Sequence, residues 1–244
     1  MSDPSRLRLE EPTPEVVAII TDIEGTTSDI AFVHDVLFPY AEEYLPQFVR
    51  ANADDPEVAA LIDDVRTEAK KPDADLDQVI GILSDWMDTD RKSTPLKALQ
   101  GMVWRQGYLE EDFTGHVYDD AVAALQAWAD DRRALYVYSS GSVAAQKLLF
   151  AYSEHGDLSS LFSGYFDTHI GPKKKAASYT AIVAELGEEP SSLLFLSDVG
   201  DELDAARAAG LQTCWVARDD DTHEKATIHE GHPIVTSFAD IELI

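Results

Sequence analysis

The stretch VVAIITDIEGTTSDI, residues 16–30, decides the fold class, because an apolar run ends in it on two acidic residues. Residues 16–20 are apolar on both alternating faces, which is typical of a strand buried within a parallel sheet. Asp22 and Glu24 follow at once, beside a turn that contains glycine. Two carboxylates held this close repel each other and lose hydration. A reason to keep them must therefore lie in function.

Three further apolar runs resemble the first one. They are ALYVY (134–138), LLFL (193–196) and TCWV (213–216), and the segment PIVTS (233–237) could add an edge strand. Helical patterns separate these runs. Strands that alternate with helices predict an α/β fold with a Rossmann-like parallel sheet flanked by helices.

Residues 31–116 contain no comparable run. Helical patterns fill this part, as in residues 55–65, where an Asp-Pro pair typical of a helix start precedes apolar residues at helical spacing. We therefore predict two domains. Residues 1–30 and 117–244 form the core domain, and residues 31–116 form an inserted helical cap domain.

Composition limits the classes of partner. The chain has 244 residues and 46 Asp and Glu against 19 Lys and Arg, a net charge of −27. Such a surface repels nucleic acid and anionic lipid, so neither nucleic acid nor a membrane is expected as a partner. Cys214 is the lone cysteine, and the N-terminus lacks the apolar segment of a secretory signal. We expect a cytoplasmic monomer.

Polar side chains follow three of the apolar runs. Asp22 and Glu24 follow the first run, Ser139 and Ser140 the second, and Asp198 the third. Ligands of open parallel sheets bind outside the carboxyl ends of the strands, so we expect these side chains in one crevice. The three carboxylates would repel one another without a cation, and oxygen ligands with no nearby His or Cys favour Mg²⁺. A magnesium site of this kind suits phosphate chemistry.

The segment GPKKKAAS, residues 171–178, holds the only triple-lysine run of the chain. A lysine at this place could neutralise a phosphate dianion, and the alternative is a solvated lysine surface. Asp22 could likewise serve only a turn, and Ser139 and Ser140 could only cap a helix that starts near Ser142. Their common position at strand ends favours a functional site.

Asp, Ser, Lys and Asp in these four places resemble the four motifs of the haloacid dehalogenase-like hydrolase superfamily. The similarity extends to one family within it, the acireductone synthases, which are the enolase-phosphatases of methionine salvage. It rests on DIEGTTSDIAFVHDVLFPYA, LKALQGMVWRQGY, YSSGSVAAQKLLF, FDTHIGPK and FLSDVGDELDAA. The resemblance covers nearly the whole chain after residue 15.

The resemblance implies roles for the acidic residues. Asp22 would be the nucleophile that becomes an aspartyl-phosphate, and Glu24 would take the place of the general acid/base. Mg²⁺ would be bound by Asp22, Glu24 and Asp198.

It also implies a phosphate site at Ser139, Ser140 and Lys173. Lys173 is chosen among the three lysines because it lies two residues after Gly171, where the family has its lysine. Lys174 and Lys175 depart from the family pattern.

The implied reaction converts 2,3-diketo-5-methylthiopentyl-1-phosphate to the acireductone 1,2-dihydroxy-3-keto-5-methylthiopentene and phosphate. A small phosphorylated diketone is thus the expected substrate. One alternative is a phosphatase of the same superfamily that acts on another small phosphorylated metabolite. Two others are a metal-free haloacid dehalogenase, which has little use for Glu24 and Asp198, and an acidic cation-binding protein without enzymatic activity, which would tolerate the loss of Asp22.

Two groups of residues outside these motifs are expected to have no catalytic or metal-binding role. His223, His229 and His232 suggest zinc, but HEGH (229–232) lacks the HExxH spacing and no cysteine joins it, so a polar surface loop is expected. Asp201 and Glu202 are expected to be charges in the first turn of a helix, with a supporting role at the site as the alternative.

Overall fold

The computed structural model describes residues 7–8, 15–229 and 231–243. The chain divides into two compact units. One unit combines Met1–Ile30 with Gly115–Ile244, and the other is Ala31–Thr114. The second unit ends at Thr114, two residues before the predicted border at residue 116.

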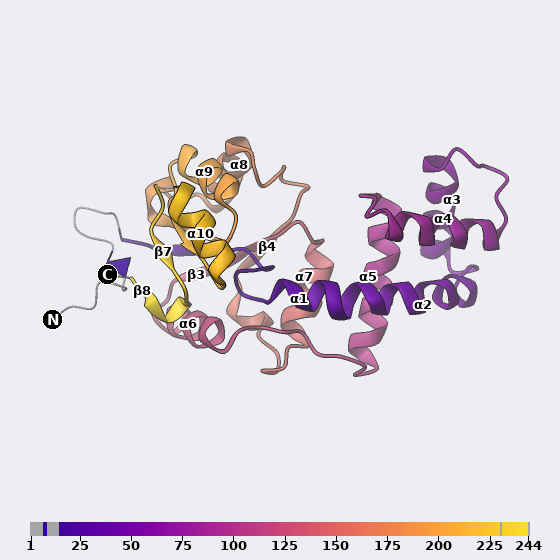
Figure 1. The fold of residues 1–244 in the computed structure, drawn as a ribbon, viewed down its shortest axis with the longest axis horizontal. Helices are drawn as coiled ribbons and strands as arrows, with labels where there is room; N and C mark the ends of the chain where they lie inside the picture. Colours follow the sequence, from indigo (N-terminus) through magenta and orange to yellow (C-terminus); the bar gives the residue numbers. More distant parts are fainter. Residues whose placement is uncertain (1–6, 9–14, 230, 244) are drawn as a thin grey trace. The chain divides into compact units, whose positions relative to one another are not determined.

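A six-stranded parallel sheet forms the centre of the first unit (Figure 1). Its order is β4-β3-β2-β5-β6-β7, and every neighbouring pair is parallel. The strands are β2 (Ala18–Thr21), β3 (Ala134–Tyr138), β4 (Gly164–Phe166), β5 (Leu193–Ser197), β6 (Gln212–Val216) and β7 (Ile234–Val235). The short pair β1 (Leu7–Arg8) and β8 (Ile241–Glu242) lies outside this sheet.

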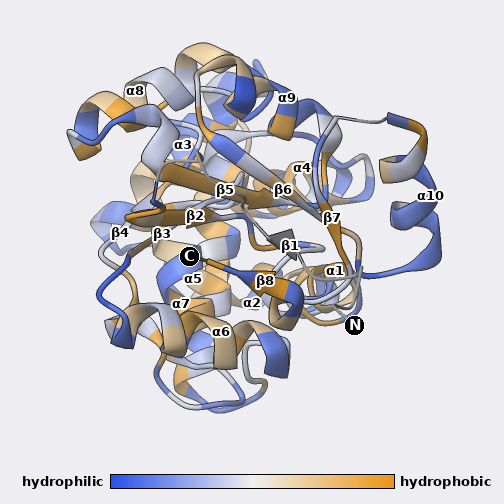
Figure 2. Ribbon diagram, turned by 90° about the vertical axis from the view of Figure 1, so that its left-hand side faces the viewer, coloured by the Kyte–Doolittle hydropathy of each residue, from blue (hydrophilic) through white to orange (hydrophobic). Residues whose placement is uncertain are grey.

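Helices cover both faces of the sheet, with α8 and α9 on one side and α6 and α7 on the other (Figure 2). The helices of this unit are α6 (Asp119–Asp130), α7 (Val143–Ala151), α8 (Ala176–Leu186), α9 (Gly200–Ala208) and α10 (Asp220–His229). Ile20, Phe195 and Leu203 are fully buried in the core between the sheet and one helix layer. The predicted α/β fold with a Rossmann-like parallel sheet is thereby confirmed.

Apolar runs in the sequence predicted most strands of this sheet. The four apolar runs correspond to β2, β3, β5 and β6, and the segment 233–237 contains the edge strand β7. β4 was not predicted. It has three residues, two of them only partly buried, and this is too short for an apolar pattern to develop.

The second unit consists of helices joined by turns, with no strand among its described residues. It contains α1 (Ile30–Phe32), whose first residue belongs to the first unit, a π-helical turn (Val33–Leu37), α2 (Phe38–Ala51), α3 (Pro56–Glu68), α4 (Leu76–Asp88) and α5 (Thr94–Leu109). Side-chain caps begin three of these helices: Asp55 accepts from the backbone of α3, Asp75 from α4 and Ser93 from α5. Such caps stabilise a helix by about 1 kcal/mol each. Leu45, Val65, Leu83 and Leu99 are fully buried at its centre.

Among the described residues, no helix combines the length and the apolar character that a bilayer crossing requires.

Candidate active site

The carboxyl ends of β2, β3 and β5 present the polar side chains of the site. Asp22 follows β2, Ser139 follows β3 and Asp198 follows β5. The strands are adjacent in the order β3-β2-β5, so all three residues lie at one edge of the sheet. The backbone continues the sheet pairing at this edge, because the Asp22 N–H donates to the Leu196 carbonyl at 2.9 Å. The position of the site therefore follows from the parallel topology.

Asp22 is buried, with 3% of its surface exposed. Its Oδ1 lies 2.6 Å from the Lys173 Nζ and accepts from the Ile23 N–H at 2.8 Å. Its Oδ2 accepts from the Ser197 hydroxyl at 3.3 Å. Partners on both oxygens hold the carboxylate in one orientation.

Lys173 is the cation of this cluster. Its Nζ lies 2.6 Å from Asp22 and 2.7 Å from the Glu202 Oε2, and the side chain is 8% exposed. Burial would lower the pKa of Lys173, but the negative charges of Asp22 and Glu202 outweigh burial and raise this pKa above its usual range. The ammonium group therefore stays charged at neutral pH.

The other two lysines of the run differ sharply from Lys173. Lys174 is exposed and pairs with Asp201 at 3.0 Å, and Lys175 is exposed at the start of α8. Gly171 helps to set this difference, since it has φ +139° and a Cβ there would lie 2.3 Å from the Ser178 hydroxyl oxygen. The turn after Gly171 thus points one lysine of three at the carboxylates.

Glu24 and Ser139 contact each other. The Ser139 hydroxyl lies 3.2 Å from the Glu24 Oε2 and donates to it, and this hydroxyl oxygen accepts from the Gly141 N–H at 3.1 Å. Burial, and then the charge of Asp22, raises the pKa of Glu24. Ser140 is exposed, unlike the fully buried Ser139. The two serines therefore have different surroundings.

Asp198 has an unsatisfied oxygen. Its Oδ1 is buried and has no hydrogen-bond partner within the described part of the chain. Burial, and then the charge of Asp22, raises the pKa of Asp198 to about 7. Gly25, with φ +73°, packs so closely that a Cβ there would lie 2.4 Å from the Asp198 Oδ2. The Asp198 oxygen is thus buried without a partner and lies beside further carboxylates. Together these carboxylates offer the oxygen ligands that a hard divalent cation prefers.

Glu202 belongs to the site, although the preferred prediction was an ordinary first-turn charge. It does lie in the first turn of α9, but it is only 7% exposed and contacts Lys173 and the Ser197 hydroxyl, the latter at 3.2 Å. Asp201, its neighbour, is exposed and fits the prediction. One signal was available in the sequence, because Glu202 lies four residues, about one turn, before Ala206 in the apolar stripe of this helix.

Comparison with known proteins identifies the family. A model described as haloacid dehalogenase-like hydrolase matches residues 16–210. "Enolase-phosphatase E1" of Azotobacter vinelandii is 57% identical over 227 residues, which cover 93% of this chain and 97% of the relative. The protein of the same name from Yersinia pestis is 54% identical over 228 residues, with the same coverage. The chain belongs to the enolase-phosphatase E1 family of haloacid dehalogenase-like hydrolases.

Solved structures share the fold of this chain. The UTR4 protein of Saccharomyces cerevisiae superimposes with a TM-score of 0.77 at 31% identity, over 91% of this chain and 98% of that one. L-2-haloacid dehalogenase from Xanthobacter autotrophicus reaches a TM-score of 0.53 at 18% identity, over 92% and 96%, and shares the fold. The resemblance found in the sequence is thus confirmed. Enzymes of this family depend in general on a divalent metal.

Proposed function

We propose that the protein is the enolase-phosphatase of methionine salvage. It converts 2,3-diketo-5-methylthiopentyl-1-phosphate to the acireductone 1,2-dihydroxy-3-keto-5-methylthiopentene and phosphate. The observation that carries this proposal is the buried contact of Asp22 with Lys173, with Glu24 and Asp198 at the same strand ends, in a chain 57% identical to an enolase-phosphatase E1. We further propose that it acts as a cytoplasmic monomer.

Asp22 is the proposed nucleophile. Its carboxylate attacks phosphorus, the bond from phosphorus to the substrate oxygen breaks, and Glu24 donates a proton to that leaving oxygen. Water then attacks the aspartyl-phosphate and gives a proton to Glu24, which releases phosphate and restores Asp22. The fixed orientation of Asp22 supports this role, because phosphoryl transfer depends mainly on positioning and charge neutralisation.

Lys173, Ser140 and Ser139 are the proposed phosphate ligands. Lys173 carries a positive charge beside the nucleophile, so it offsets the charge of the incoming phosphate. Ser140 is exposed at the turn before α7 and is free of the Glu24 contact that holds Ser139. Ser139 has one hydroxyl proton and would contact phosphate only by releasing Glu24, so we assign it first to the orientation of Glu24.

Asp22, Glu24 and Asp198 are the proposed Mg²⁺ ligands. The unpartnered Asp198 Oδ1 supports this assignment. When bound, the ion offsets negative charge on the phosphate and on an enolate. Chelation should abolish activity and added Mg²⁺ should restore it, whereas a metal-free dehalogenase would be indifferent to chelation.

The helical unit Ala31–Thr114 is the proposed cap. A cap of this kind excludes water and contacts the organic part of the substrate.

A phosphate-release screen over phosphorylated metabolites, with the diketone included, tests the substrate assignment. We expect the diketone to give the highest kcat/KM, together with the ultraviolet absorbance of the enol product. A higher kcat/KM for another metabolite would instead support the alternative phosphatase of the same superfamily.

Glu202→Gln should lower kcat about tenfold to a hundredfold with little change in KM. Lys173 loses one of its two anionic partners in this variant, and a hydrogen bond to a charged group contributes about 1.5–3 kcal/mol. Lys173 then pairs with Asp22 alone, so this ion pair competes with the attack of the Asp22 carboxylate on the phosphate. Asp201→Asn is the matched control, since this neighbour is exposed and forms an exposed ion pair with Lys174. Equal kinetics of the two variants would remove Glu202 from the site.

A further inference from the structure

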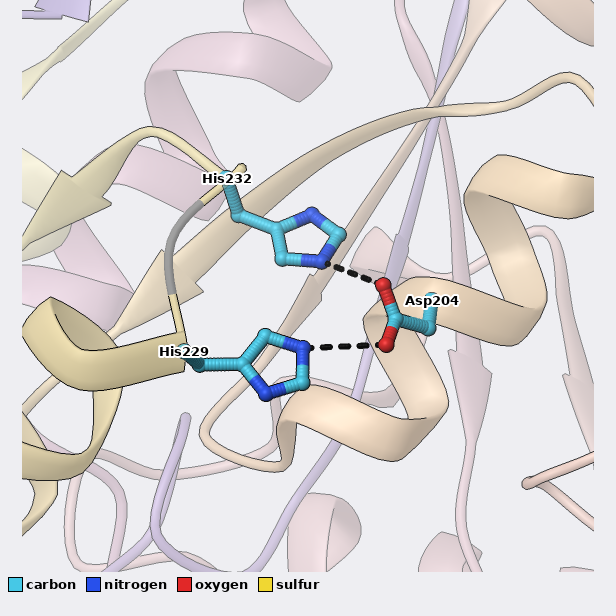
Figure 3. A group of neighbouring side chains, drawn as sticks. All are labelled: Asp204, His229 and His232. Carbon is cyan, nitrogen blue, oxygen red and sulfur yellow. Dashed lines mark hydrogen bonds and ion pairs between the residues drawn. The ribbon is translucent and has the colours of Figure 1, made fainter.

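A second group of metal-ligand side chains lies on the opposite face of α9 from Glu202. Asp204, His229 and His232 form this group, which we call the histidine cluster (Figure 3). The His229 Nε2 lies 2.9 Å from the Asp204 Oδ2, and the His232 Nε2 lies 3.2 Å from the Oδ1. Asp204 follows Glu202 by two residues, which is about 200° around the helix. The histidine cluster is therefore separate from the candidate active site.

The expected polar surface loop is correct for the exposure of His223 and His229, but it is wrong for their helical structure and for the burial of His232. His229 is the last residue of α10, and the His232 side chain has no exposed surface. The HExxH test could not reveal the cluster, because the third ligand comes from another helix, 25 residues earlier than His229.

Side chains of β6 hold the two histidine rings in place. The His232 Nδ1 lies 2.8 Å from the Thr213 hydroxyl, and the Trp215 ring packs against both imidazoles. The two imidazoles are nearly parallel, with 19° between their planes. A partner on Nδ1 fixes the orientation in which Nε2 faces a metal, as in known metal sites. When the hydroxyl accepts the Nδ1 proton, the Nε2 lone pair is available to a metal ion; in the other tautomer the Nε2–H donates to Asp204, and a metal would replace that proton.

The chemistry of the donors selects the metal. Two imidazole nitrogens and one carboxylate suit Zn²⁺ and its neighbours in the transition series, whereas Mg²⁺ prefers oxygen ligands alone. All three donor atoms lie within 4.8 Å of one another. The Asp204 and His229 side chains are 40% and 32% exposed, which leaves the cluster open to an ion and to a water as the fourth ligand. We propose that the histidine cluster binds Zn²⁺.

Arg207 would compete with a metal ion for the Asp204 carboxylate. Its guanidinium lies 2.5 Å from the Asp204 Oδ1 and also donates to the Gly231 carbonyl at 2.7 Å. It is about half exposed, so it can turn away when an ion arrives. Removal of this cation should therefore strengthen metal binding. If these side chains only formed hydrogen bonds with one another, removal of Arg207 would not strengthen metal binding.

The test is calorimetric titration of chelator-treated full-length protein with Zn²⁺, in saturating Mg²⁺ to occupy the carboxylates of the candidate active site. We expect one bound Zn²⁺ per chain and a rise in melting temperature. His229→Gln should weaken binding at least tenfold, while His223→Gln, an exposed histidine on the same helix, should bind as the wild type does. Arg207→Gln should bind more tightly. Cobalt, as a spectroscopic substitute, should show visible absorption bands that His229→Gln loses.

Several results would overturn the proposal. These are no Zn²⁺ bound by the wild type, an equal loss of binding in His223→Gln and His229→Gln, or an affinity unchanged in Arg207→Gln. His229 is chosen over the buried His232 because a partly exposed side chain can be replaced with little risk to folding. Phosphatase activity in Mg²⁺ should be the same in His229→Gln and the wild type, so this result is independent of the proposed function.

Discussion

Asp22→Asn should abolish phosphate release, with a loss on the order of 10⁴-fold or more, because it removes the proposed nucleophile. The amide is nearly the same size and can still accept from the Ile23 N–H, so the fold should survive. Lys173 would keep its contact with Glu202 at 2.7 Å. Phosphate release under single-turnover conditions and circular dichroism of the same sample measure the two effects.

The matched control for Asp22→Asn is Asp201→Asn. It makes the same chemical change at an exposed position that forms an ion pair with Lys174. Magnesium titration of both variants separates loss of the nucleophile from loss of a metal ligand. A folded Asp22→Asn protein with turnover like the wild type would disprove the nucleophile assignment and, with it, the aspartyl-phosphate.

Lys173→Ala should lower kcat/KM about a hundredfold to a thousandfold, whereas Lys174→Ala should have almost no effect. Loss of one fixed charge-stabilising group in an enzyme site commonly costs this much. Lys174 forms an exposed ion pair, and such pairs contribute about 1 kcal/mol or less to stability. Steady-state kinetics of the two variants, prepared side by side, provides the measurement.

Lys173→Ala should also destabilise the protein. It leaves Asp22 and Glu202 buried without their cation, and breaking a buried ion pair by removing one partner costs about 3–5 kcal/mol. Thermal melts should therefore accompany the kinetics, with assays well below the lower melting temperature. If Lys174→Ala were instead the variant with low activity, the wrong lysine would have been placed at the phosphate.

The sheet and the main residues of the site could be predicted from local sequence. A strand that is largely buried on both faces needs a continuous apolar run, so β2, β3 and β5 can be predicted from the sequence alone. The parallel topology then brings Asp22, Ser139 and Asp198 to one edge. β4 escaped detection because three residues, two of them only partly buried, carry too little apolar signal.

Burial and long-range contact could not be predicted in this way. Asp201 and Glu202 are adjacent acidic residues in one helical turn, yet one is exposed and the other is buried against Lys173. The direction in which a helix faces the sheet makes that difference, and it depends on packing along the whole of α9. His232 and Asp204 are 28 residues apart, and their contact arises where α9 lies beside the segment that leads into β7. Apolar runs and strand ends are properties of neighbouring residues, whereas a buried charge or a shared ligand set is a property of elements brought together by folding.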